Sequence, residues 1–262
     1  MFGEDRLFHD LWPGTAVPEP LRAAVDRLGG TAWPEVVGSW SRLTPNGCPV
    51  ELVAGAGPRW TTEVAGPEFP DSERLSLAAE LAGLPSTALL AWLHDQQRGV
   101  PLRFGAWLGG PSPKVYAELT GPAPPAPYSL PIPGAMPRML ALDPVRGRTE
   151  LYLALPPVDP AELGGVLGPA ARCLASLPDG LARLRGRRLG LSACWTGDDD
   201  PELALFASAR TLFPAAPSLL HQLVPALATV TTPHRLGLVT FRLNPAGLAA
   251  VVGLSPVQSS FF

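Results

Sequence analysis

Short apolar runs dominate this sequence, and they come in pairs separated by turns rich in Gly, Pro, Asn or Asp. Two such runs joined by a short turn predict a β-hairpin, whose strands are antiparallel. The sequence therefore predicts ten strands in five hairpins. The paired runs are 49–57 with 59–66, 102–110 with 114–121, 138–144 with 148–155, 188–196 with 202–209, and 234–243 with 247–254.

Helical spacing of apolar residues separates most of these hairpins. A helix is expected over 159–185 and another over 218–229, while 71–98 predicts two helices interrupted at 83–86. No helix is expected between the second and third hairpins. Hairpins alternating with helices form a weak internal repeat of about 40 to 50 residues.

The expected fold class is α+β, with one domain over 1–262. N-terminal helices, with apolar spacing over 21–28 and 36–43, occupy 1–44, and the hairpin-helix repeats occupy 45–262. Closing ten antiparallel strands into a barrel removes the exposed sheet edges and leaves an interior wide enough for a ligand. The helices then cover the outside, and an open α+β sheet is the alternative.

Composition excludes several classes of protein. The 20 basic residues against 23 acidic ones exclude a generally basic nucleic-acid binder. With 46% apolar residues and no uncharged apolar run of about 18, the chain is expected to form a globular core without inserting into a membrane. The start resembles no secretory signal, which favours the cytoplasm, and the separated Cys48, Cys173 and Cys194 are interpreted as core fillers. No feature specifies an oligomeric state.

Polar side chains gather on single faces of four predicted strands, because residues two apart share a face. If these faces line the barrel, its interior contains cations, tyrosine rings and carboxylates; if not, they are the wet faces of a half-exposed sheet. The groups are Lys114, Tyr116 and Glu118; Arg148, Glu150 and Tyr152; Glu51 with Val53; and Arg59 with Thr61 and Glu63.

The stretch 46–66, NGCPVELVAGAGPRWTTEVAG, resembles the ABBA-barrel aromatic prenyltransferases, especially the indole (dimethylallyltryptophan synthase) branch. That family has a G-x-P-x-E strand followed by an R-[YF]-T-x-E strand, matched here around Glu51 and Arg59. Its K-x-Y strand is matched by Lys114 and Tyr116, and its R-x-K-x-Y strand by 148–152, with Glu150 where Lys is usual. The resemblance spans about 44–155.

The resemblance implies a metal-independent aromatic prenyltransferase that uses no cofactor and does not require Mg²⁺. Its partners would be an allylic diphosphate, which supplies the prenyl group, and a small indole-like aromatic in natural-product biosynthesis. Glu51 would hold the N–H or O–H of the aromatic. Arg59, Lys114, Arg148 and, less directly, Arg103 would bind the diphosphate, while Tyr116 and Tyr152, with Glu150 and Trp107 in the pocket, would shield the developing cation.

A second hypothesis follows from departures from the family pattern. Glu150 places a negative charge beside the expected diphosphate, the chain has only three tyrosines, and Phe241 and Arg242 stand where another K-x-Y strand is expected. The barrel would then bind a hydrophobic or aromatic ligand, or catalyse a reaction other than prenylation. The acidic run 198–202 is interpreted as a solvated turn and not as a magnesium site, because Gly197 precedes its three aspartates and Pro201 follows them.

Overall fold

A computed structural model describes most of the chain, with ten strands and seven α-helices in the residues described. These are residues 3–28, 48–66, 68–121, 124–130, 132–157, 159–177, 180–197, 199–214, 217–244 and 247–256. The strands are β1 (Val50–Ala54), β2 (Arg59–Glu63), β3 (Ala106–Gly110), β4 (Lys114–Glu118), β5 (Met136–Asp143), β6 (Arg148–Ala154), β7 (Gly190–Thr196), β8 (Glu202–Ser208), β9 (His234–Asn244) and β10 (Gly247–Pro256).

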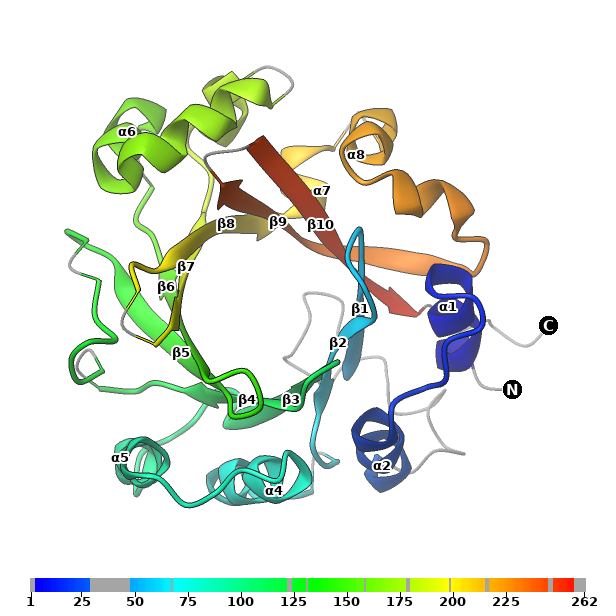
Figure 1. The fold of residues 1–262 in the computed structure, drawn as a ribbon, viewed down its shortest axis with the longest axis vertical. Coiled ribbons are helices and arrows are strands. Elements are labelled where there is room, and N and C mark those ends of the chain that lie inside the picture. Colours follow the sequence, from blue (N-terminus) through cyan, green and yellow to red (C-terminus); the bar gives the residue numbers. More distant parts are fainter. Residues whose placement is uncertain are drawn as a thin grey trace.

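The strands form one closed barrel in which every neighbouring pair is antiparallel (Figure 1). Strands follow chain order around the barrel, and β1 pairs with β10 to close it, with Leu52 opposite Leu254. Closure pairs the backbone groups that an open sheet would leave at its edges. The predicted ten-stranded barrel is confirmed, and the open-sheet alternative is wrong.

Helices surround the barrel on its outside (Figure 1). Helix α4 packs on β3 and β4, while α1 packs on β1 and β10. The α-helices are α1 (Gly3–Leu11), α2 (Glu19–Arg27), α4 (Arg74–Leu81), α5 (Ala88–Gln97), α6 (Pro160–Leu167), α7 (Ala209–Leu212) and α8 (Pro217–Leu223). None of the described helices combines the length and the apolar character that crossing a lipid bilayer requires.

Two helical predictions need correction. The expected helix over 159–185 consists of α6 and two 3-10 segments, Gly168–Ser176 and Gly180–Leu184, because Gly168 adopts a positive φ of 54° that ends α6. The expected helix over 218–229 divides into α8 and a 3-10 segment, Pro225–Thr229, where proline cannot continue the α-helical hydrogen bonds. The two helices expected within 71–98 are confirmed as α4 and α5. The helix expected over 36–43 lies outside the described residues.

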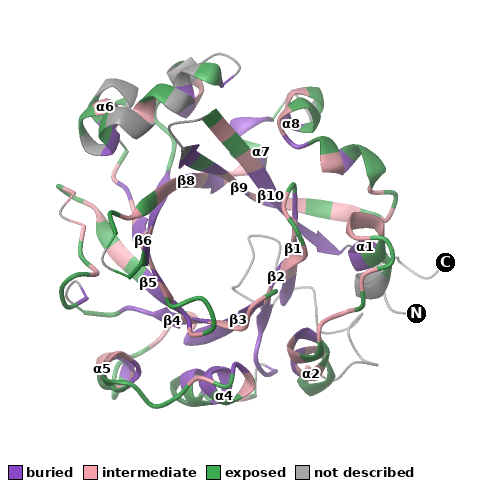
Figure 2. Cartoon of the chain, in the orientation of Figure 1, coloured by how far each residue is buried: buried purple, intermediate pink, exposed green. Residues whose placement is uncertain are grey.

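The main core lies between the barrel and its helices (Figure 2). Alternate residues of β1, Val50, Leu52 and Ala54, are buried, as are Val115 and Ala117 of β4. These side chains point outward against the helices, and burying each large one stabilises the fold by about 1.5–3 kcal/mol. Successive side chains of a strand point to opposite faces, so the residues between them point into the barrel.

Candidate active site

The barrel interior, here called the lumen, contains eight of the nine site residues predicted from the sequence. Residues that lie opposite one another on paired strands point to the same face of the sheet. Glu51 lies opposite Thr61, Thr61 opposite Gly109, and Gly109 opposite Lys114. The same face continues from Trp107 through Tyr116 and Ala141 to Glu150. Arg59, Arg148 and Tyr152 are two residues from members of this face on their own strands, so they share it. The wet-outer-face interpretation of these residues is therefore wrong.

Lys114 and Glu150 form an ion pair inside the lumen, joining β4 to β6. Both side chains are 14% exposed. Ser192 and Tyr152 also hydrogen-bond to the Glu150 carboxylate. Glu150, which stands where the family pattern has Lys, thus neutralises one of the protein's own lumen cations.

The ion pair holds both partners in their charged forms. Burial alone would lower the pKa of Lys114, but the Glu150 carboxylate outweighs burial and raises this pKa to about 12. Burial alone would likewise raise the pKa of Glu150, but Lys114 and the hydroxyl donors lower it to about 2. Burial and the neighbouring Glu150 charge raise the pKa of Tyr152 well above its ordinary value, which keeps its hydroxyl protonated.

Aromatic rings line the wall beside this pair. The ammonium of Lys114 lies 4.9 Å from the ring centre of Tyr116 and 5.8 Å from that of Tyr152. The two tyrosine rings are 5.8 Å apart, and Phe206 of β8 contacts Tyr152 at 5.9 Å. Phe206 was not predicted, although its alternation with the buried Leu205 and Ala207 could have indicated a lumen position. Three rings on β4, β6 and β8 thus present π faces that favour a cation.

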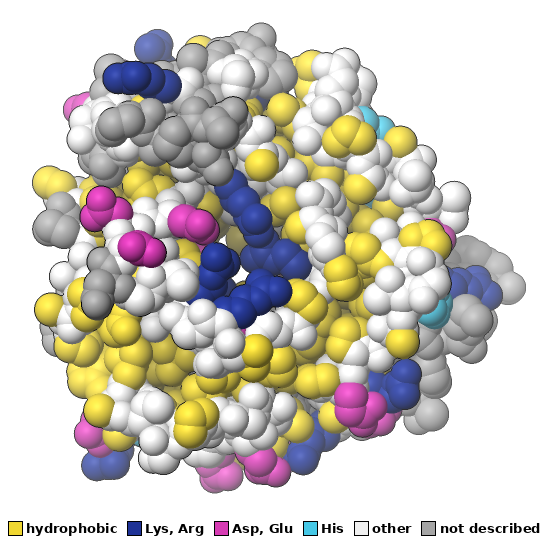
Figure 3. All heavy atoms as spheres, in the orientation of Figure 1, with side chains coloured by type: hydrophobic (Ala, Val, Ile, Leu, Met, Phe, Trp, Pro, Cys, Tyr) yellow, Lys and Arg dark blue, Asp and Glu magenta, His cyan; other side chains and the backbone are white. Residues whose placement is uncertain are grey.

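Arg59, Arg148 and a third guanidinium, Arg242 of β9, face the same lumen. Arg242 lies opposite Ala204, which lies opposite Ser192, which lies opposite Tyr152. Burial and the nearby Arg59 lower the pKa of Arg242, and Arg148 contributes in the same direction. Figure 3 shows the molecule hollowed at its centre, with Lys and Arg side chains gathered around the opening. Sequence reasoning noticed Arg242 without assigning it to the site.

These three guanidiniums make no ion pair or hydrogen bond within the described part of the chain. Each carries a fixed positive charge and up to five N–H donors. Like charges held together in a concave wall raise the local positive potential. This arrangement suits an anion that accepts several hydrogen bonds.

The carboxyl group of Glu51 lies against two glycines, one on β9 and one on β10. A Cβ atom at Gly237 of β9 or at Gly253 of β10 would collide with the Glu51 carboxyl group. The Leu238 amide hydrogen-bonds to this carboxyl, whereas Oε1 has no partner among the described residues. Burial raises the pKa of Glu51 to about 7, against the smaller effect of the Leu238 amide. A carboxyl with this pKa can accept or release a proton near neutral pH.

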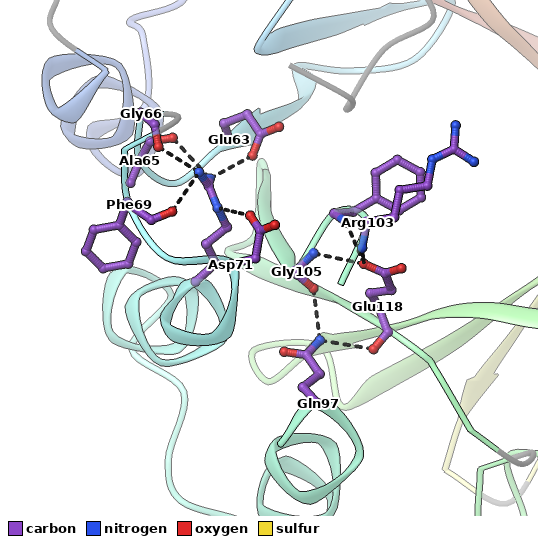
Figure 4. Close-up of polar contacts among 11 residues, drawn as sticks. Glu63, Ala65, Gly66, Phe69, Asp71, Gln97, Arg103, Gly105 and Glu118 are labelled. Atoms are coloured by element: carbon purple, nitrogen blue, oxygen red, sulfur yellow. Dashed lines mark hydrogen bonds and ion pairs between the residues drawn. The ribbon is translucent and has the colours of Figure 1, made fainter. Parts of the chain in front are cut away.

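Two further carboxylates of the barrel, Glu63 and Glu118, bind the protein's own groups (Figure 4). Oε2 of Glu118 accepts hydrogen bonds from the backbone amides of Arg103, Phe104 and Gly105 at 2.8, 2.5 and 3.0 Å. Glu63 pairs with the buried Arg74 of α4 at 3.1 Å. Both carboxylates therefore shape the barrel wall.

Arg103 lies outside the strands, in the loop before β3. Its guanidinium stacks on the Phe104 ring at 4.9 Å and points away from Glu118 in Figure 4. Trp107, 9% exposed, contacts the Phe104 ring edge-on at 5.1 Å, and its indole N–H has no partner in the described residues. The loop thus brings two aromatic rings together beside the lumen wall.

Cysteine positions bring one correction. Cys48 is buried, in agreement with a core role, but Cys194 of β7 lies on the lumen face between Glu150 and Glu202. Burial, followed by the Glu150 charge, raises the pKa of the Cys194 thiol, which disfavours the reactive thiolate. The side chain of Cys173 lies outside the described residues.

The described residues contain no group of three or more His, Cys, Asp or Glu side chains that could hold a metal ion. Asp199 and Asp200 are exposed in the connection between β7 and β8. Asp198 lies outside the described residues.

Searches for related proteins return matches only from solved structures: no family model and no curated protein matches the sequence. The 5-dimethylallyl tryptophan synthase from Streptomyces coelicolor, in complex with DMASPP and Trp, superposes with a TM-score of 0.67 at 17% identity, covering 98% of this chain and 93% of that one. The 6-dimethylallyltryptophan synthase from Micromonospora olivasterospora gives 0.65 at 18% identity, covering 97% of each chain. AnaPT from Neosartorya fischeri gives 0.55 at 16%, covering 89% and 84%.

Both bacterial proteins are similar over nearly the whole of this chain, including the part beyond residue 155 where the sequence resemblance ended. At these identities the likeness establishes architecture. The resemblance read from the sequence is thus confirmed at the level of the fold, and the chain, divergent in sequence, has the closed ten-stranded barrel of the aromatic prenyltransferases.

Proposed function

We propose that the protein transfers a prenyl group from an allylic diphosphate, or a related allylic phosphate ester, to an electron-rich, indole-like aromatic. The observation that carries this proposal is the meeting, in one lumen, of three unpaired guanidiniums with a carboxyl group of raised pKa. Structural neighbours in complex with DMASPP and Trp support the same pairing of substrates.

In this proposal, Arg59, Arg148 and Arg242 stabilise the negative charge that develops on the leaving phosphate. Tyr116 and Tyr152 present their rings to the allylic cation as its bond to oxygen breaks. Their packing excludes water that would otherwise capture the cation.

Glu51 accepts a hydrogen bond from the N–H or O–H of the aromatic, which increases the electron density of the ring as it attacks. The arene carbon forms the new C–C bond, and the proton it loses is taken up by a base, for which the Glu51 carboxylate is suited by its pKa of about 7. Neither step uses a metal or a redox cofactor. Arg103 and Trp107 complete the pocket in this proposal, and a single cytoplasmic domain remains its expected form.

The alternative, a barrel that binds an aromatic ligand without prenyl transfer, is favoured by one observation. Glu150 already satisfies Lys114, a cation expected to contact the donor. The test is to incubate the purified protein with dimethylallyl, geranyl and farnesyl diphosphates and the matching monophosphates, together with a panel of indoles and phenols. Mass spectrometry should find a product heavier by one prenyl group, whereas acceptor binding without any product would favour the alternative.

A further inference from the structure

We infer that the lumen holds a single phosphate group in place of a diphosphate, so the prenyl donor is an allylic phosphate monoester. This inference rests on the proposed function and narrows its donor. The inference depends on which lumen cations and hydroxyls are free to bind a ligand, because the protein's own carboxylates already contact some of them.

One group of lumen donors already binds Glu150 and is not free for a ligand. Its carboxylate accepts from the Lys114 ammonium and from the hydroxyls of Ser192 and Tyr152. A second anion at this place would lie against a buried carboxylate whose pKa is about 2, and which therefore stays charged throughout the physiological range. Like charges in a partly dry site repel strongly, so the Lys114 side of the lumen is closed to a phosphate group.

A second group of cations, the three lumen arginines, is free to bind an anionic ligand. Arg59, Arg148 and Arg242 have no ion-pair partner in the described chain, and they influence one another electrostatically. Glu202 lies beside them on the same face, opposite Cys194, and interacts with Arg242. The Lys114–Glu150 pair is neutral, so among the charges that act on Arg242 the three guanidiniums stand against the one unpaired negative charge of Glu202.

This balance matches a phosphate monoester better than a diphosphate. A phosphate monoester carries about −1.5 to −2 charge at pH 7, and three acceptor oxygens for three guanidiniums. The additional phosphate group of a diphosphate adds about one more negative charge, which exceeds the net positive charge of this cluster and its neighbour Glu202. Arginine forks bind phosphate oxygens in pairs, and the three terminal oxygens of a monoester offer one such pair to each guanidinium.

The reaction balances with the monoester. The allylic C–O bond breaks with its electron pair going to the phosphate oxygen, and the aromatic carbon forms a bond to the allylic carbon. The aromatic ring then loses one proton, and inorganic phosphate leaves. No oxidant, reductant or metal takes part.

Calorimetry with dimethylallyl phosphate and dimethylallyl diphosphate tests the inference directly on the wild-type protein. We expect the monophosphate to bind at least as tightly as the diphosphate. In Glu150→Gln, which removes the charge and frees Lys114, the diphosphate should gain at least about tenfold in affinity and become the preferred ligand. Glu80→Gln, an exposed carboxylate on α4, is the matched control and should leave both affinities unchanged.

Wild-type protein that binds the diphosphate about tenfold more tightly than the monophosphate would overturn this inference while leaving the proposed function intact. Binding of neither ester would overturn both. The wild-type ratio decides the question even if Glu150→Gln fails to fold, because it needs no variant.

Discussion

Lys114 of β4 and Glu150 of β6 form an ion pair across the intervening strand β5, on which the small Ala141 lies beside Glu150. Ala141 lies opposite Tyr116 on one side and opposite Glu150 on the other. An ion pair that spans a strand needs a short side chain beneath it, since a larger one would occupy the same space. Ala141 therefore permits a contact that links three strands through their side chains.

Replacing Lys114 with Met should destabilise the protein by about 3–5 kcal/mol, because it leaves the Glu150 carboxylate buried without its cation. The double variant Lys114→Met/Glu150→Leu should recover most of that loss, since neither charge then remains buried. Urea unfolding followed by circular dichroism measures both. A double variant as unstable as the single one would contradict this account.

Acid should weaken the same contact over a defined range of pH. The pKa of Glu150 is lowered to about 2 from an ordinary value of 4.5. Its contribution to stability is therefore complete above pH 4.5 and lost as the pH falls toward 2. The difference in unfolding free energy between wild type and Glu150→Gln should shrink over this interval. A difference that stays constant from pH 6 to pH 2 would show that pairing with Lys114 does not lower the pKa of Glu150.

Glu51→Gln should reduce turnover by more than about tenfold with folding intact. Because the pKa of Glu51 is about 7, wild-type turnover should rise as the pH passes through that value, and the variant should lose this rise. Activity against pH is the measurement. Equal profiles in the two proteins would remove Glu51 from the reaction.

Burial of Glu51 also predicts an effect on stability. A folded-state pKa raised from 4.5 to about 7 means that the protonated form is favoured in the folded state. The contribution is full below pH 4.5 and disappears as the pH rises through 7. Thermal unfolding between pH 5 and 8 should therefore show wild type losing stability relative to Glu51→Gln.

Arg74→Met should be among the most destabilising single changes, at about 3–5 kcal/mol. The buried guanidinium contacts the carboxylates of Glu63 and Asp71, and it donates to the backbone carbonyls of Ala65 and Gly66 (Figure 4). Removing it leaves the Glu63 charge buried. The matched control is Arg22→Met on α2, whose exposed pair with Glu19 should contribute less than about 1 kcal/mol.

Much of the barrel could be predicted from the sequence because its strands alternate so regularly. In β6, Thr149, Leu151 and Leu153 face outward, and the residues between them form the lumen wall. A period of two residues determines both faces at once. The same pattern predicts that Arg59, Lys114 and Arg148 each lie on the polar face of their strand.

Other features depend on contacts that no local pattern encodes. Glu118 has the same alternation as Lys114, yet it binds the 103–105 backbone, which only the folded loop brings near. The two glycines against Glu51, Gly237 and Gly253, come from strands far along the chain, which local periodicity cannot reveal. Arg242 stands where a K-x-Y strand is expected, and its place beside Arg59 and Arg148 depends on the pairing of β9 with β8, which local periodicity does not give.

Pairing of β1 with β10 has a consequence for how the protein folds. Leu52 pairs with Leu254, so the barrel cannot close until the chain has been synthesised through β10. Glu51 acquires its surroundings at this same seam, against Gly237 and Gly253. The surroundings of Glu51 should therefore form only when the barrel closes. A chain that ends before β10 would contain Glu51 but would lack the burial that raises its pKa.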